Sequence, residues 1–276
     1  MLLESKVEKL KISTSERAVI KYISQIKTQA VKMSEDELAS GSYTSKATVS
    51  RAIKHAGYRS LSEFRREFEV ESQYMMQSYY NMNPNMPFER EESLLSMINK
   101  IFDLMHEALW DTKMLLEQNQ EELDQAITLL NEAKFIHVCG SPYGRELAHI
   151  FVNDMSKIGR LVNVIANGQY LSSVVTKKDV VICICYEDDR HEQKEQLKTL
   201  RDLNVPVILI SALGKNPLKE LATVFLPVTS RENVYFKVKG FATQISALMI
   251  FNALYSGYFL NKYDEHVETI RLNQNI

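Results

Sequence analysis

The sequence has little cysteine, and this argues against two classes of site. Its three cysteines, Cys139, Cys183 and Cys185, contain no Cys-x-x-Cys pair. Neither a zinc site built on paired cysteines nor a disulfide framework is therefore indicated. Because all three cysteines lie in apolar runs, we expect buried thiols. We expect neither a cofactor nor a resident metal.

Long apolar runs and a targeting signal are also missing. The most apolar segment, residues 241–260, is interrupted by Gln244, Asn252 and Gly257, so we expect a packing helix and no membrane span. Residues 1–6 do not have the shape of a signal peptide. These features predict a cytoplasmic protein without a membrane partner.

The net charge is small and unevenly distributed. The net charge is −2, but residues 1–70 hold 13 Lys and Arg against 9 Asp and Glu, which leaves −6 for the remainder. A basic N-terminal module on an acidic body is typical of a small nucleic-acid-binding domain attached to a larger partner domain.

Residues 43–57 have the pattern of a DNA-recognition helix. Thr44 and Ser45 are good N-caps, and Gly57 can adopt the left-handed conformation that ends a helix. At 100° per residue one stripe is small and apolar, and the other is polar. The apolar stripe holds Val49, Ala52, Ile53 and Ala56, and the polar stripe holds Ala47, Ser50, Arg51, Lys54 and His55.

The preceding residues distinguish this helix from an ordinary solvated surface helix. Ser34 and Glu37 have capping-box spacing, and the short helix they begin ends at Gly41, three residues before the next cap. That is the spacing of a helix-turn-helix. Ser13 and Glu16 begin a further helix that extends to residue 31. We therefore predict an all-α DNA-binding domain over residues 1–72, followed by a linker over residues 73–92.

Specific side chains of this domain are expected at the DNA. We predict that Arg51, with Ser50 and Ala47, contacts base edges, and that Ser45, Thr48 and Lys54 contact phosphates. The full predicted DNA-binding set is Thr44, Ser45, Lys46, Ala47, Thr48, Ser50, Arg51 and Lys54.

The second half alternates apolar strands with helices. Two amphipathic helices are expected over residues 93–132, and a long apolar helix over 237–260 closes the chain. Strands are expected near residues 134–140, 161–165, 179–185, 205–210 and 224–228. Nearly continuous Val and Ile strands separated by helices predict a parallel five-stranded sheet covered on both faces. Ligands bind beyond the carboxyl ends of such strands, which places a pocket at residues 140–144, 186–191 and 212–216.

Over nearly its whole length the sequence resembles the RpiR family of bacterial transcriptional regulators. The resemblance is carried by residues 14–17, 33–39, 45–51 and 57–64, and by 136–140, 179–185, 206–211 and 216–222. It implies an N-terminal helix-turn-helix and, over residues 93–276, a three-layer α/β/α sugar isomerase (SIS) domain. It also implies a homodimer, or a dimer of dimers, on a two-fold symmetric operator. Such a regulator senses a small metabolite, typically a sugar phosphate.

The sensing loops depart from the family's pattern. The first loop resembles Gly-x-Gly-x-Ser but has Pro142 at the second Gly and Gly144 at the Ser. The second loop lacks the expected row of hydroxyls and has acidic residues at positions 187–189, which repel a phosphate dianion. An amino sugar, another cation, Mg²⁺ or no ligand are the alternatives to a sugar phosphate. The predicted ligand-binding residues are Gly140, Ser141, Gly144, Arg145, Cys185, Tyr186, Glu187, Arg190, His191 and Glu232.

Two other functions compete with the regulator. The first is a SIS-type sugar-phosphate isomerase, with Glu187, His191 and Glu232 as candidate acid or base groups. It is disfavoured because an enzyme has no use for residues 13–68, so we expect no enzymatic activity. The second is a helix-turn-helix that binds another protein. For the dimer interface we expect helix 237–260 to contribute, with packing inside one subunit as the alternative.

Overall fold

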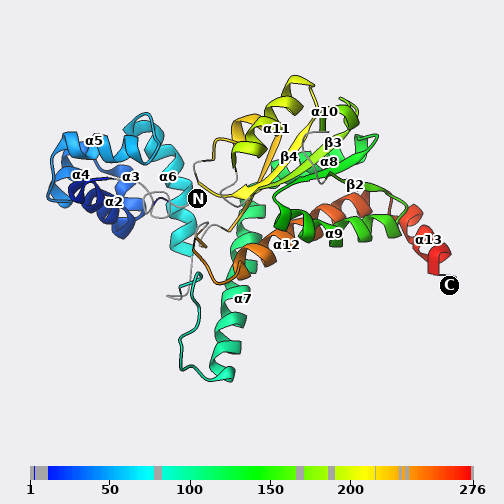
Figure 1. Ribbon diagram of the computed structural model, residues 1–276, viewed down its shortest axis with the longest axis horizontal. Helices are drawn as coiled ribbons and strands as arrows, with labels where there is room; N and C mark the ends of the chain where they lie inside the picture. The colour runs from blue at the N-terminus through cyan, green and yellow to red at the C-terminus, as the bar shows by residue number, and fades with distance from the viewer. Residues whose placement is uncertain are drawn as a thin grey trace.

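The computed structural model describes residue 3 and residues 12–77, 83–165, 171–185, 190–214, 216–229, 232–233 and 236–274. A small helical domain lies beside a larger α/β domain, and the helix α7 leaves the body of the larger domain (Figure 1). The helical domain contains α2 (Thr14–Ile26), α3 (Thr28–Lys32), α4 (Glu35–Gly41), α5 (Lys46–His55) and α6 (Leu61–Gln77).

The helical domain forms because each helix buries one apolar face in a common core. The predicted stripe of α5 is buried at Val49, Ala52, Ile53 and Ala56, against side chains of α2, α4 and α6. Both predicted capping boxes are present, at Ser13–Glu16 and Ser34–Glu37. Gly57 has φ +89° directly after the helix, as a C′ glycine should.

The helix predicted from residue 13 to residue 31 is instead two helices. Lys27 has φ +50° and separates α2 from α3. An isolated left-handed residue of this kind is rarely visible in sequence unless it is glycine or asparagine. At the other end, α6 continues to Gln77 and so enters the segment predicted as a linker.

The α/β domain begins with α7 (Leu94–Gln118) and α8 (Gln120–Glu132), as predicted. Its sheet contains β1 (Ile136–Gly140), β2 (Val162–Val164), β3 (Val180–Cys185), β4 (Val207–Ala212) and β5 (Val224–Val228). All pairs are parallel in the order β2-β1-β3-β4-β5. The order reverses between β1 and β3, and ligands bind at such a switch point, beyond the carboxyl ends of the strands.

Helices cover both faces of the sheet. One face packs against α8, α9 (Pro142–Lys157) and α12 (Phe241–Asn261). The other packs against α11 (Arg190–Asp202) and the 3₁₀ helix η2 (Lys219–Leu221), with α10 (Leu171–Val174) nearby (Figure 1). The three-layer α/β/α fold predicted from the sequence is therefore confirmed.

The end of the chain differs from the prediction. The long apolar helix, α12, does not close the chain, because α13 (Tyr263–Gln274) follows it. α12 is packed inside the subunit, with Leu254 buried and Met249 against the main core. No helix within the described residues is long and apolar enough to cross a membrane.

Candidate DNA-binding surface and ligand site

The outward face of α5 presents a short, mixed row of side chains. Ser45 is the N-cap, and its Oγ accepts from Thr48 N at 3.2 Å. Lys46, Ala47, Arg51 and Lys54 are exposed, and Ser50 is half-buried. The face therefore offers a hydroxyl, a methyl and cations within two helical turns, which are the groups that read base edges and phosphates.

Arg51 is held in place by its neighbours. Its Nη2 donates to Thr48 Oγ1 at 3.2 Å, and its Nε lies 3.6 Å from Glu16 Oε1. His55 Nδ1 lies 3.2 Å from the same carboxylate oxygen. The side chain of Arg51 is 58 % exposed and that of Glu16 only 6 %, so a buried carboxylate on α2 orients an exposed guanidinium.

Three of the predicted contact residues have partners within the domain. Thr48 is buried and its hydroxyl lies 2.9 Å from Ser45 Oγ. Thr44 Oγ1 lies 2.9 Å from Ser42 Oγ. Lys46 Nζ forms an ion pair with Asp36 at 2.7 Å. Thr48 is thus placed to orient Ser45 and Arg51, while the phosphate contact predicted for it would require it to leave the domain core.

Glu16 should make the stability of the helical domain pH-dependent. Its pKa is lowered from 4.5, first by the Ser13 backbone hydrogen bond and further by the Ser13 hydroxyl, His55 and Arg51. A lowered pKa stabilises the fold above pH 4.5, and this stabilisation is lost as the pH falls through the lowered pKa. We expect Glu16→Gln to cost about 1 kcal/mol at pH 7.

The measurement is urea unfolding of both proteins between pH 3 and pH 7. The difference between wild type and Glu16→Gln should shrink as the pH falls. Ser13→Ala is the matched control, because it removes the cap but leaves the contacts of Glu16 with Arg51 and His55. A difference that stays constant across this range would show that the charge of Glu16 contributes nothing.

The first predicted ligand loop is tightly built at the carboxyl end of β1. Gly140 has φ +131°, and a Cβ there would lie 2.0 Å from Ile184 O. Ser141 is buried, donates its N–H to Ile184 O at 3.0 Å, and caps α9 through Gly144 N at 3.2 Å. Arg145 Nη1 donates back to Gly140 O.

This loop uses its donors internally. The N–H groups of Ser141, Gly144 and Arg145 all have protein acceptors, and Pro142 has no N–H to offer. A phosphate needs free N–H donors at a helix N-terminus. The loop that has Pro142 and Gly144 in place of the family's Gly and Ser therefore has fewer free N–H donors for a phosphate.

A buried polar chain at the ends of β3 and β4 was only partly predicted, because residues 212–216 were expected at the pocket but the pairing of Ser211 with Asn216 was not. Ser211 Oγ donates to Cys185 O, and Asn216 Nδ2 donates to Ser211 Oγ at 2.8 Å. Asn216 Oδ1 in turn accepts from Leu218 N at 3.1 Å. Ser211 ends an apolar strand and Asn216 precedes a proline, so each looks like an ordinary boundary residue in sequence. Their pairing depends on strand register.

Glu232 caps a helix. Its Oε1 accepts from Ala242 N at 2.6 Å, and its Oε2 accepts from Thr243 N at 3.2 Å and from the Thr243 hydroxyl. Lys237 Nζ lies 4.0 Å away. Burial raises the pKa of Glu232 against these hydrogen bonds. Both carboxylate oxygens are thus engaged at the first turn of α12, which leaves Glu232 badly placed for the acid–base role that the isomerase hypothesis gave it.

The remaining predicted ligand residues are Cys185, the last residue of β3, and four residues that follow it in the sequence. Cys185 is buried, as are Cys139 and Cys183, and none of the three forms a disulfide. Tyr186 and Glu187 lie outside the described residues, as do the acidic positions 188 and 189. Arg190 and His191 begin α11, but the structure does not describe their side chains. In the described part of the chain, no group of His, Cys, Asp or Glu side chains is arranged to hold a metal ion.

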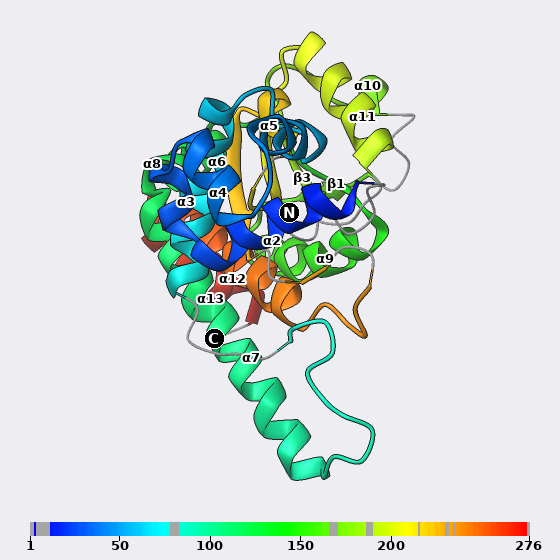
Figure 2. The same cartoon turned by 90° about the vertical axis from the view of Figure 1, so that its left-hand side faces the viewer.

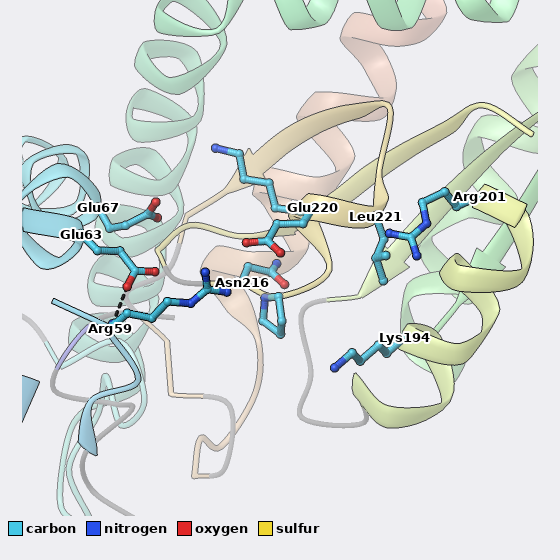
Figure 3. Close-up of a pocket in the computed structure, with 10 residues that line it drawn as sticks. Arg59, Glu63, Glu67, Lys194, Arg201, Asn216, Glu220 and Leu221 are labelled. Carbon is cyan, nitrogen blue, oxygen red and sulfur yellow. Dashed lines mark hydrogen bonds between the residues drawn. The ribbon is translucent and has the colours of Figure 1, made fainter. Parts of the chain in front are cut away.

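A cleft of about 340 Å³ lies between the two domains (Figure 3). Its wall on the DNA-binding domain contains Arg59, Glu63 and Glu67, all in or just before α6. Its wall on the α/β domain includes Asn216, so the buried Ser211–Asn216 chain connects the end of the sheet to the cleft. That second wall also carries Pro217, Leu221, Lys194, Arg201, Lys219 and Glu220.

Comparison with known proteins gives the class. Residues 129–256 match the model of the SIS domain. A protein of Caldanaerobacter subterraneus subsp. tengcongensis, named as an uncharacterized HTH-type transcriptional regulator, is 25 % identical over 92 % of this chain and 88 % of its own. A Clostridium perfringens protein of the same description is 23 % identical over 94 % of this chain and 92 % of its own.

Solved structures share the fold. The Vibrio vulnificus NanR protein, solved in complex with ManNAc-6P, matches with a TM-score of 0.60 at 18 % identity, over 99 % of this chain and 95 % of that one. The sugar isomerase domain of an RpiR transcription factor from Sphaerobacter thermophilus matches with a TM-score of 0.54 at 13 % identity, over 63 % of this chain and 98 % of that one.

The chain thus contains a SIS domain and is similar over both of its domains to proteins named as HTH-type transcriptional regulators. Relatives that span both domains and the SIS match are consistent with the RpiR resemblance seen in the sequence motifs.

Proposed function

We propose that this protein is a sequence-specific DNA-binding transcriptional regulator of an operon for sugar or amino-sugar metabolism. The observation that carries the proposal is the α5 face, where exposed Arg51 is oriented by Thr48 and Glu16 beside exposed Ala47 and Lys54. Relatives over more than nine-tenths of the chain are named as transcriptional regulators.

The SIS domain is the proposed sensor, and its effector is an amino sugar or a derivative of one. The fold is shared with a regulator solved with ManNAc-6P, a phosphorylated amino sugar. In this chain the donors of the first loop are bonded internally, and the second loop carries three acidic residues. Acceptor-rich groups favour the amino or hydroxyl groups of a sugar over its phosphate, because like charges repel.

The interdomain cleft is the proposed route from effector to DNA. A ligand at the carboxyl ends of β3 and β4 contacts the Ser211–Asn216 chain, whose other end forms the cleft wall opposite α6. An effector shifts the orientation of the DNA-binding domain only if it binds one arrangement more tightly than another.

The alternative function is a sugar-phosphate isomerase. It draws on the fold, because a structure described as a phosphoheptose isomerase from Francisella tularensis matches with a TM-score of 0.50 at 16 % identity, over 61 % of this chain and 100 % of that one. It is disfavoured because Glu232, one of its candidate acid–base groups, is engaged as a helix cap.

The test is binding of the purified protein to the DNA upstream of its own operon across a salt series, repeated with glucosamine, N-acetylmannosamine and ManNAc-6P. We expect specific binding that a non-phosphorylated amino sugar shifts. If only ManNAc-6P shifts DNA binding, the SIS domain does bind phosphate, and the proposed preference for a non-phosphorylated amino sugar is wrong. Absence of specific binding at low salt would contradict the regulator, and turnover of sugar phosphates would then support the isomerase.

A further inference from the structure

The turn between α4 and α5 holds a tyrosine in an unusual backbone conformation. Tyr43 has φ +53°, in the left-handed region that residues with a Cβ rarely adopt and that strains a bulky residue most. Tyr43 is also 97 % exposed, so its ring contacts almost nothing of its own chain. The conformation of Tyr43 is therefore strained, and packing within the domain does not compensate for the strain.

The turn has a glycine, but that glycine does not occupy the left-handed position. Gly41 is the last residue of α4, and a Cβ there would lie 2.2 Å from Cζ of Tyr22 on α2. Gly41 therefore makes room for the ring of Tyr22. The left-handed position comes two residues later, where a glycine would fit without strain. Turns of this kind often contain a glycine, and here the strained position has an exposed tyrosine instead.

Backbone hydrogen bonds fix the turn at Tyr43 itself and at the next residue. The N–H of Tyr43 donates to Ser40 O at 3.2 Å, and the N–H of Thr44 donates to Ala39 O at 2.8 Å. The fold thus sets the direction in which the side chain of Tyr43 leaves the domain. A tyrosine side chain also has few torsions to order, so it can make a contact at a low cost in conformational entropy.

The turn lies beside the proposed recognition helix, on an open side of the molecule. Tyr43 comes two residues before Ser45, the N-cap of α5. Figure 2 shows α4 and α5 on the side of the helical domain that faces away from the α/β domain. In a helix-turn-helix the N-terminal residues of the second helix reach the base edges, while the first helix crosses the DNA backbone. The turn that joins them therefore follows the edge of the major groove, next to the phosphates.

We propose that Tyr43 anchors the helical domain on the DNA backbone, where its phenolic hydroxyl donates a hydrogen bond to a phosphate oxygen beside α5. Tyrosine is among the side chains that make such bonds. The inference rests on the proposed DNA-binding function and adds to it a residue outside the set expected from the sequence. Because the phenol is neutral, this contact releases no counterion and reads no base. It differs in this from the contacts expected of Arg51 and Lys54.

The first measurement is the DNA affinity of full-length wild type and Tyr43→Phe across a salt series. The two DNAs are the region upstream of the protein's own operon and a duplex of unrelated sequence. We expect Tyr43→Phe to weaken binding to both by about 3- to 10-fold, with an unchanged salt dependence, because no charge is lost. Tyr263→Phe is the matched control, since it removes an exposed phenol from α13 in the other domain and should leave both affinities unchanged.

The second measurement is urea unfolding without DNA. Tyr43→Gly should unfold at a urea concentration no lower than wild type, because relief of the left-handed strain outweighs the extra flexibility of glycine in the unfolded chain. The same variant should lose at least as much DNA affinity as Tyr43→Phe. A merely structural role of Tyr43 would not give weaker DNA binding by a protein that is no less stable.

Three results would overturn the inference. They are wild-type affinity of Tyr43→Phe, a loss confined to the upstream DNA, and a Tyr43→Gly variant that is less stable than wild type. The first is also the result expected if Tyr43 contacts a protein partner instead of DNA. Arg51→Ala distinguishes this inference from the proposed function: if it weakens binding and Tyr43→Phe does not, the regulator stands and the Tyr43 contact is rejected. A wild type that binds neither DNA rejects both.

Discussion

Gly140→Ala is expected to unfold the SIS domain under conditions where wild type is stable. The added Cβ would meet the backbone oxygen of Ile184 at 2.0 Å, on the neighbouring strand β3, at a residue with φ +131°. The strands would have to separate at the last of the five residue pairs that align β1 with β3. We expect a loss of more than about 3 kcal/mol, measured by urea unfolding followed by circular dichroism.

Gly159→Ala is the control that distinguishes the steric clash of an added Cβ from the strain of a positive φ. Gly159 also has a positive φ, +79°, but its added Cβ would meet only Thr269 Cγ2, at the ordinary distance of 3.7 Å. This control should cost about 1–2 kcal/mol, the penalty for a left-handed residue alone. Equal losses from the two variants would mean that the loop at Gly140 relaxes, and that its glycine serves only the dihedral angle.

Arg51→Ala is expected to weaken operator binding by roughly 1–3 kcal/mol and to relax the preference at one base pair. Arg51 is exposed and is oriented by Thr48 and Glu16, so its guanidinium is already ordered before DNA arrives. The measurement is a binding isotherm on the operator and on operators substituted at each position.

Lys54→Ala is the matched control on the same face. Lys54 is exposed and was assigned to phosphate on sequence grounds. Its removal should weaken binding to all sequences alike and reduce the salt dependence by about one ion. An Arg51→Ala variant with unchanged affinity and unchanged preference would remove Arg51 from the reading face.

Local patterns in the sequence predicted most of the fold. The three capped helices were visible because capping boxes and apolar stripes are local, and the five strands because a buried parallel strand is almost continuously apolar. Two features escaped prediction. The break between α2 and α3 falls at Lys27, where no glycine marks the end of a helix. The helix α13 is weakly amphipathic, and it follows a helix that we expected to be the last of the chain.

The site was less predictable, because its contacts join residues distant in sequence. Ser211 and Asn216 pair with the end of β3 only through the sheet register. In the sequence Glu232 resembles an acidic loop residue, because Ala242, whose N–H it accepts at the start of α12, lies ten residues later. Thr48 was predicted to contact a phosphate, but its hydroxyl contacts Ser45 and Arg51 of its own helix region instead.

The cleft between α6 and the SIS domain has a thermodynamic consequence. Because residues of both domains form its walls, an effector that changes their orientation also changes operator affinity. Free energies of binding are reciprocal, so operator DNA must change effector affinity by the same factor. A regulator that releases DNA when it binds a sugar will bind that sugar less tightly on the operator than free in solution. The number of operator copies in the cell then helps to set the sugar concentration at which the genes respond.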